Sequence, residues 1–149
     1  FCIYVEKIMK KNIKSVLFVC NLNSVRSVIA AGLLKNLNQN NLIVESAGVK
    51  TGPIDNFAIE VMCELSIDIT KHEPQLLENF KDENFDIVIT LSPEAQHIAK
   101  EMTRDNSWEI EYWPSYDVNN IQGSREQILA GYREIRDQLK ELIFNKFNN

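Results

Sequence analysis

The stretch FVCNLNSVRS, residues 18–27, decides the fold because an apolar run breaks into small polar residues at a cysteine. Its first half belongs to SVLFVC (15–20), a continuous β-branched and aromatic run that is typical of a strand covered on both faces of a parallel sheet. Beyond the break, large apolar residues recur every fourth position over 29–37 and predict a helix that begins close to Ser27. The sequence therefore predicts a strand, a polar loop and a helix in immediate succession.

Strand and helix patterns alternate along the rest of the chain. We expect further strands over 42–48, 85–92 and 109–113, and further helices over 57–66, over 94–102 and after residue 124. The last helix is preceded by Ser124, with Gln127 three residues later, which is a capping-box pattern. The alternation predicts a three-layer α/β fold, in which a four-stranded parallel sheet has right-handed crossovers and helices on both faces.

Length and composition are those of one ordinary globular domain. The chain has 149 residues, of which 44% are hydrophobic and 25% charged, and no apolar run approaches the ~18 residues that would cross a bilayer. The net charge of -5, from 16 basic and 21 acidic side chains, argues against general binding to nucleic acid or to an anionic membrane. We expect a single domain over 9–149, with any anion site confined to a local cluster.

The N-terminus and the cysteines bear on the setting of the protein. Residues 1–8 are expected to be a non-native or disordered extension, because Met9 opens MKKNIKS, which leads straight into the first strand. Cys2 would then carry no function. The three cysteines, Cys2, Cys20 and Cys63, are too few and too irregular for a disulfide framework, and none has zinc-ligand spacing. We therefore expect a reducing, cytoplasmic setting, and no metal or cofactor.

Cys20 ends the first strand and is therefore expected at the carboxyl edge of the sheet, where ligands of doubly wound domains collect. The loop from Asn21 to Arg26 leads into a helix start, whose backbone N–H groups lack intrahelical partners and form a cradle for a phosphate-sized anion. The cradle and Arg26 favour the thiolate, which is the nucleophilic form, and Arg26 can hold two oxygens of the anion. The small polar residues between strand and helix make a plain buried cysteine the weaker interpretation.

The stretch VCNLNSVRS resembles the Cys-x5-Arg-Ser phosphate loop of the low-molecular-weight protein tyrosine phosphatases and of the thioredoxin-coupled arsenate reductases that share their fold. The similarity continues in ESAG (45–48), IDITKHEP (67–74) and FDIVITLS (85–92). The segment EYWPSYDVNNIQGSREQ (111–127) is similar to a bacterial branch of phosphatase-like proteins. The resemblance covers nearly the whole chain from Ser15 and implies a sheet in the order 2-1-3-4.

This resemblance implies a role for each residue of the loop. Cys20 would attack phosphorus and become a phosphocysteine, and Ser27 would hydrogen-bond the thiolate and help it to leave. Asn23 matches the family's loop asparagine, which adopts a left-handed conformation, and Ser46 matches the partner that holds it. The phosphoryl oxygens would be bound by the loop, namely by Asn21, Leu22, Asn23, Ser24, Val25 and Arg26.

Asp117, in the loop after the fourth strand, is the expected general acid. A phenolate leaving group needs a proton, and the same carboxylate would then activate the water that hydrolyses the thiophosphate. The family usually has proline after this aspartate, whereas here Val118 follows. The alternative interpretation is that Asp117 caps a turn in a solvated loop. Tyr116 and Trp113 could line the substrate entrance, although aromatic residues at strand ends more often belong to the core.

Three positions depart from the patterns of the family or of its reductases. Leu22 stands where glycine is common and is expected to narrow or re-angle the loop, and Val25 stands where many members have a second cysteine. Ser92 takes the place of a cysteine that the thioredoxin-coupled reductases use. Cys63 lies on a helix pattern that favours core packing. We therefore expect no intramolecular electron relay.

The sequence favours a metal-free cysteine phosphatase that acts on a phosphorylated protein or a small aryl phosphate, with inorganic phosphate or another oxyanion as a ligand of the loop. Two alternatives stay open: an arsenate reductase that uses an external thiol, and a non-catalytic phosphate or phosphoprotein binder. His72 and His97 are too few for a metal site and are expected at the surface or at helix ends.

Overall fold

The computed structural model describes residues 13–37, 41–104 and 106–147, which contain a parallel four-stranded sheet in the order β2-β1-β3-β4. Its strands are β1 (Ser15–Cys20), β2 (Ile43–Gly48), β3 (Ile87–Thr90) and β4 (Ile110–Tyr112). The helices are α2 (Arg26–Leu37), α3 (Asn56–Cys63), α4 (Pro93–Met102) and α5 (Arg125–Phe147), with short 3₁₀ helices η1 (Leu77–Phe80) and η2 (Val118–Asn120). The predicted α/β fold and the order 2-1-3-4 are confirmed.

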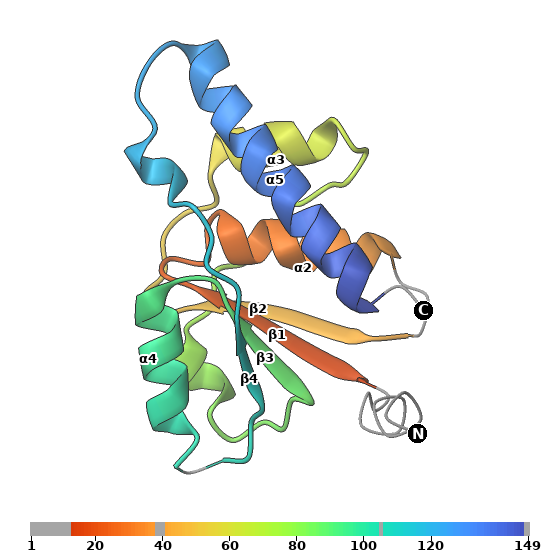
Figure 1. The fold of residues 1–149 in the computed structure, drawn as a ribbon, viewed down its shortest axis with the longest axis vertical. Helices are drawn as coiled ribbons and strands as arrows, with labels where there is room; N and C mark the ends of the chain where they lie inside the picture. Colours follow the sequence, from red (N-terminus) through yellow and green to blue (C-terminus); the bar gives the residue numbers. More distant parts are fainter. Residues whose placement is uncertain (1–12, 38–40, 105, 148–149) are drawn as a thin grey trace, which may run out of the picture.

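The sheet separates two apolar layers, because successive residues of a strand point to opposite faces. In β1, Val16 and Phe18 pack with the core side chains of α2, α3 and α5, whereas Leu17 and Val19 pack with those of η1 and α4. Figure 1 shows α2, α3 and α5 on one side of the sheet and α4 on the other. These four residues in the middle of β1 are fully buried, as the continuous apolar run predicts.

Helix α3 ends earlier than the sequence predicts and turns a different side to the core. It stops at Cys63 rather than at Ser66, and Ser66 has a φ of 60°, a left-handed conformation outside the helical region. The buried side of α3 carries Ala58, Val61 and Met62. Cys63 lies about 100° further round the helix than Met62, and it is exposed. The prediction that Cys63 packs in the core is therefore wrong.

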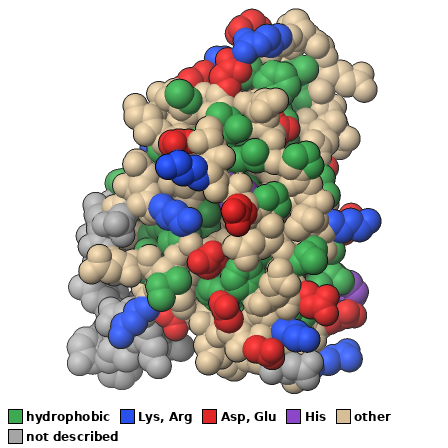
Figure 2. Space-filling model, turned by 180° about the vertical axis from the view of Figure 1, so that it is seen from behind, with side chains coloured by type: hydrophobic (Ala, Val, Ile, Leu, Met, Phe, Trp, Pro, Cys, Tyr) green, Lys and Arg blue, Asp and Glu red, His purple; other side chains and the backbone are tan. Residues whose placement is uncertain are grey.

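The predictions for residues 1–8, Met9 and Cys2 fall outside the described residues. In the part of the chain that the structure describes, no helix is long and apolar enough to cross a membrane. On the face shown in Figure 2, basic and acidic side chains are interspersed across the surface. This face therefore offers no broad basic surface for an anion.

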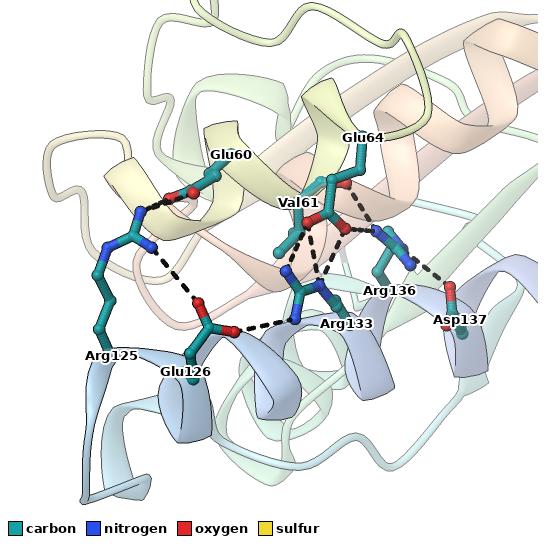
Figure 3. A network of polar contacts seen from close by, with 8 residues as sticks. All are labelled: Glu60, Val61, Glu64, Arg125, Glu126, Arg133, Arg136 and Asp137. Atoms are coloured by element: carbon teal, nitrogen blue, oxygen red, sulfur yellow. Dashed lines mark hydrogen bonds and ion pairs between the residues drawn. The ribbon is translucent and has the colours of Figure 1, made fainter.

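An ion-pair network joins α3 to α5 (Figure 3). Glu64 accepts hydrogen bonds from Arg133 Nη2 at 2.8 Å and from Arg136 Nη1 at 2.6 Å. Arg136 is buried and also donates to the carbonyl of Val61 at 2.8 Å. The hydrogen bonds from the two arginines lower the pKa of Glu64 from 4.5 to about 2. The network therefore depends on an ionised Glu64.

Replacing Glu64 by glutamine removes the charge that the two arginines contact and is expected to lower the free energy of unfolding at pH 7 by about 1 kcal/mol. The loss is no larger because Glu64 is partly exposed, and solvent screens its charge. The folded pKa lies below the unfolded value of 4.5, so the stabilisation is present above pH 4.5 and is lost as the pH falls to about 2. Urea unfolding at several pH values should therefore show the wild-type and E64Q stabilities converging in acid.

Glu126→Gln is the matched control for that experiment. Glu126 belongs to the same network, but its side chain is 76% exposed and its carboxylate lies 3.8 and 3.9 Å from Arg125 and Arg133. The control should change stability little. Equal losses in E126Q and E64Q, or a pH-independent loss in E64Q, would contradict the assignment of the effect to Glu64.

Candidate active site

Residues 21–25 form the loop between β1 and α2, and carbonyl groups along it accept hydrogen bonds from backbone N–H groups of other residues. The segment 49–52, which follows β2, donates three backbone hydrogen bonds of 2.8–3.0 Å to the carbonyls of residues 20–22. The carbonyls of Ser24 and Val25 accept from residues 55 and 29. Within the described ranges, no N–H group of residues 21–25 donates to a protein acceptor. This is the arrangement that an anion cradle requires.

Asn23 is buried in this loop and has a φ of 54°, the left-handed conformation that the resemblance implies. Its side-chain amide donates to Ser27 Oγ at 2.8 Å, and its Oδ1 accepts from the N–H of Gln75 at 2.9 Å. His72 Nε2 lies 3.0 Å from the same Oδ1. The structure gives these partners in place of Ser46, which is buried in β2 and makes no hydrogen bond to Asn23. The expectation for Ser46 is corrected accordingly.

His72 is a residue of the site that sequence reasoning placed at the surface or at a helix end. It is half-buried, and its Nε2 faces both Oδ1 and the carbonyl oxygen of Asn23, at 3.0 and 3.2 Å. Burial lowers the pKa of His72, so the ring is neutral at pH 7 and Nε2, which faces two acceptors, carries the hydrogen. The signal for this role was the histidine of IDITKHEP. His97, by contrast, is exposed on α4, as expected.

Cys20 ends β1 with its side chain buried, and its Sγ lies 2.9 Å from Ser27 Oγ. Because Ser27 Oγ already accepts a hydrogen bond from Asn23, its own hydrogen is available to the sulfur. A chain of polar contacts thus runs from Asn23 through Ser27 to Cys20. The contact between Ser27 and Cys20 is the one that the resemblance implies.

Arg26 is the first residue of α2, and its side chain is buried beside the ends of β3 and β4. Its Nη1 donates to the carbonyls of Leu91 and Ser115, at 3.2 and 3.3 Å. Its Nε and Nη2 have no acceptor among the described residues. Nε and Nη2 form one edge of the guanidinium, and such an edge can bind two oxygens of an oxyanion.

Ser92 ties the loop to α4. It is buried as the N-cap of α4, where its Oγ accepts from the N–H of Ala95 at 3.1 Å. The same hydroxyl donates to Asn21 Oδ1 at 2.6 Å, and Asn21 is the first residue of the loop. At the position where the thioredoxin-coupled reductases have a cysteine, this chain therefore has a capping serine that holds the loop.

Leu22 fits the loop without backbone strain. Among the described residues other than glycine, a positive φ occurs at Asn23, Asn41 and Ser66, so Leu22 needs no glycine-like conformation. Its side chain is 36% exposed and lies next to Gly52. The side chain of Leu22 extends over the neighbouring segment, and the expectation that Leu22 narrows or re-angles the loop stays a prediction.

Asp117 lies in the loop after β4 and is half-exposed. Its carboxylate caps η2 by accepting from the N–H of Asn119 at 3.0 Å, which is the alternative role that the sequence left open. Two residues earlier, the carbonyl of Ser115 contacts Arg26, so this loop adjoins the cradle. Of the nearby aromatic residues, Tyr116 is 60% exposed, whereas Trp113 is buried against the core.

A model of the low molecular weight phosphotyrosine protein phosphatase family matches residues 15–146. The chain belongs to this family. Its relatives include the glutaredoxin arsenate reductase of Synechocystis sp., which is 32% identical over 132 residues that cover 89% of this chain and 95% of the relative. The matched region contains the parallel sheet and the loop from Cys20 to Ser27.

Solved structures that are similar to this chain include an arsenate reductase and a tyrosine phosphatase. An arsenate reductase in its phosphate-binding state is 30% identical, with a TM-score of 0.70 over 89% of this chain and 95% of that chain. The tyrosine phosphatase AmsI of Erwinia amylovora shares the fold, with a TM-score of 0.74 over 93% and 95% of the two chains at 19% identity. Family membership therefore establishes an enzyme of the phosphatase or arsenate reductase type.

Proposed function

We propose that the protein hydrolyses aryl phosphates, with protein phosphotyrosine as the substrate class, through a phosphocysteine on Cys20. The observation that carries this proposal is the position of Cys20 Sγ, 2.9 Å from Ser27 Oγ and directly before a loop whose N–H groups have no protein acceptor. The other described cysteine, Cys63, is exposed on α3. A nucleophile with an oxyanion cradle, and with no second thiol adjoining it among the described residues, supports hydrolysis.

In the first step, the Cys20 thiolate attacks phosphorus, the S–P bond forms and the P–O bond to the leaving group breaks. The loop N–H groups and the Nε–Nη2 edge of Arg26 bind the three remaining oxygens as their charge shifts. Asp117 gives its proton to the leaving oxygen. In the second step, Asp117 takes a proton from water, the water oxygen attacks phosphorus, and the thiolate leaves with a hydrogen bond from Ser27.

The rim of the loop supports an aromatic leaving group. Leu22 in the loop and Tyr116 beside the proposed acid are two of the large hydrophobic side chains that the described residues expose. An aryl group attached to the bound phosphoryl would pack against such side chains, whereas an inorganic oxyanion has no apolar part to bury. A thiol nucleophile also needs reducing conditions, and we accordingly assign the protein to the cytoplasm.

Arsenate reduction with an external thiol is the second candidate, and the relatives favour it: the Synechocystis enzyme and an arsenate reductase from Staphylococcus aureus are 32% and 30% identical. Cys20 would displace an oxygen of arsenate as water. An external thiol would then attack the Cys20 sulfur, arsenic would leave as As(III) with the electron pair of the S–As bond, and a second thiol would reduce the mixed disulfide.

Acid quenching of the protein during turnover of p-nitrophenyl phosphate, followed by peptide mass spectrometry, tests the proposal. We expect one phosphoryl group on the peptide that contains Cys20, together with release of p-nitrophenol. A parallel assay with arsenate, glutathione and glutaredoxin measures arsenite. Arsenite formation without any phosphocysteine would favour the reductase, and phosphate binding without either reaction would leave a non-catalytic binder.

A further inference from the structure

The loop from β4 to α5, which contains η2 and Asp117, packs against α5 (Figure 1). Val118 is buried in the core on the α5 side of the sheet. A Cβ atom added at Gly131 would lie 2.1 Å from Ile121 Cδ1, so Ile121 occupies the space that a side chain at position 131 would need. Glycine inside a helix costs about 1 kcal/mol relative to alanine. The glycine at position 131 therefore lowers the stability of α5 but leaves room for Ile121 of the loop.

Tyr132, the next residue of α5, contacts the start of α3. It is buried, its ring packs against Phe57 at a centroid distance of 5.4 Å, and its hydroxyl donates to Asp55 Oδ2 at 2.8 Å. Burial, the hydrogen bond to Asp55 and the charges of Asp55 and Asp117 all raise the pKa of Tyr132. The Tyr132 hydroxyl therefore stays protonated and keeps donating to Asp55.

Asp55 links Tyr132 to the oxyanion loop. Its backbone N–H donates to the carbonyl of Ser24 at 3.3 Å, and its Oδ1 caps α3 by accepting from the N–H groups of Phe57 and Ala58, at 2.7 and 3.2 Å. Its other carboxylate oxygen, Oδ2, accepts the hydrogen bond from the Tyr132 hydroxyl. Helix α5 thereby contacts the loop that carries Asp117 directly and the loop that follows Cys20 through Asp55.

We propose that Gly131 and Tyr132 are positioning residues that form a seat on α5 for the loop carrying Asp117 and so fix that carboxylate relative to the oxyanion cradle. This rests on the proposed function, in which Asp117 is the general acid. Proton transfer requires hydrogen-bond reach, and a shift of about 1 Å in a positioned group can cost about 100-fold in rate. A displaced acid slows only those substrates whose leaving group needs its proton.

Gly131→Leu tests the seat, because the new side chain would expel Ile121. We expect kcat/KM to fall about 10- to 100-fold for phenyl phosphate and less than about threefold for 2,4-dinitrophenyl phosphate, whose leaving group departs without a proton. The double variant G131L/I121A should regain most of the loss, since the leucine then fills the emptied space. Tyr132→Phe should act in the same direction with a smaller effect.

Asp117→Asn is the reference variant, because G131L should cost D117N little further activity on phenyl phosphate if both act through the same acid. Equal losses on both esters, or losses that multiply with D117N, would overturn the proposal. Hydrogen–deuterium exchange over 113–121 gives a readout without turnover: exchange should be faster in G131L and restored in G131L/I121A, and unchanged exchange would overturn the seat. If the wild type hydrolyses neither ester, the proposed function fails, and the exchange result alone decides the seat.

Discussion

Cys20→Ser is expected to lower kcat/KM for p-nitrophenyl phosphate by about 10⁴-fold or more. A serine hydroxyl ionises far less readily than a thiol, and an alkoxide leaves phosphorus less readily than a thiolate in the second step. Inorganic phosphate should still bind, because the groups that face the anion, namely the N–H groups of residues 21–25 and Arg26, are unchanged. Steady-state kinetics and titration calorimetry with phosphate measure the two effects separately.

Cys63→Ser is the matched control for the nucleophile. Cys63 is exposed on α3, so its substitution should leave both kcat/KM and phosphate affinity within about twofold of the wild type. Turnover that survives in C20S would rule out Cys20 as the nucleophile. Arsenite formation that is lost in C63S would show that Cys63 takes part in an electron relay, contrary to the hydrolytic proposal.

Arg26→Lys is expected to lower kcat/KM for the same ester by about 10³-fold, although the positive charge is kept. A lysine ammonium has no planar edge with which to bind two oxygens at once. The substitution also removes the hydrogen bonds from Nη1 to the carbonyls of Leu91 and Ser115, and the second of these ties the loop of Asp117 to the cradle. Phosphate affinity should fall together with the rate, which distinguishes this variant from C20S.

Arg125→Lys provides the comparison for a change of the same chemical type outside the site. The side chain of Arg125 is 60% exposed and pairs with Glu60 at the surface of α5, so activity should stay within about twofold of the wild type. Circular dichroism of each variant checks the fold. A functional R26K enzyme would mean that charge alone, rather than bidentate binding, serves the oxyanion.

The centre of the site can be predicted from local pattern. Cys20 and Arg26 stand at the ends of two elements with different apolar periods, so the sequence locates the loop between them and the carboxyl edge of the strand. The order of the strands came from the resemblance, because periodicity says which face is buried but not which strands are neighbours. The fold and the loop were therefore accessible without coordinates.

The partners of the loop could not be predicted in the same way. His72 and Gln75 reach Asn23 across 49 and 52 residues of sequence, and such contacts between irregular segments leave no periodic signal. The apolar pattern that Cys63 shares with Ile59 and Met62 favours the core, but α3 has only 8 residues, and the pattern of so short a helix does not define its buried side. The sequence alone likewise shows Gly131 only as a glycine inside a helix, because its contact with Ile121 depends on how the loop packs on α5.

The pairing of the loop carbonyls with the segment 49–52 bears on protein engineering. The loop and the segment after β2 fit closely together: a Cβ atom on Gly48 would lie 2.7 Å from the nitrogen of Asn23. Transplanting FVCNLNSVRS into another α/β scaffold would supply the thiol and the arginine but leave the loop carbonyls without their donors. A transplant therefore has to bring 43–55 along with 15–27, together with partners for Asn21 and Asn23 equivalent to Ser92, His72 and Gln75.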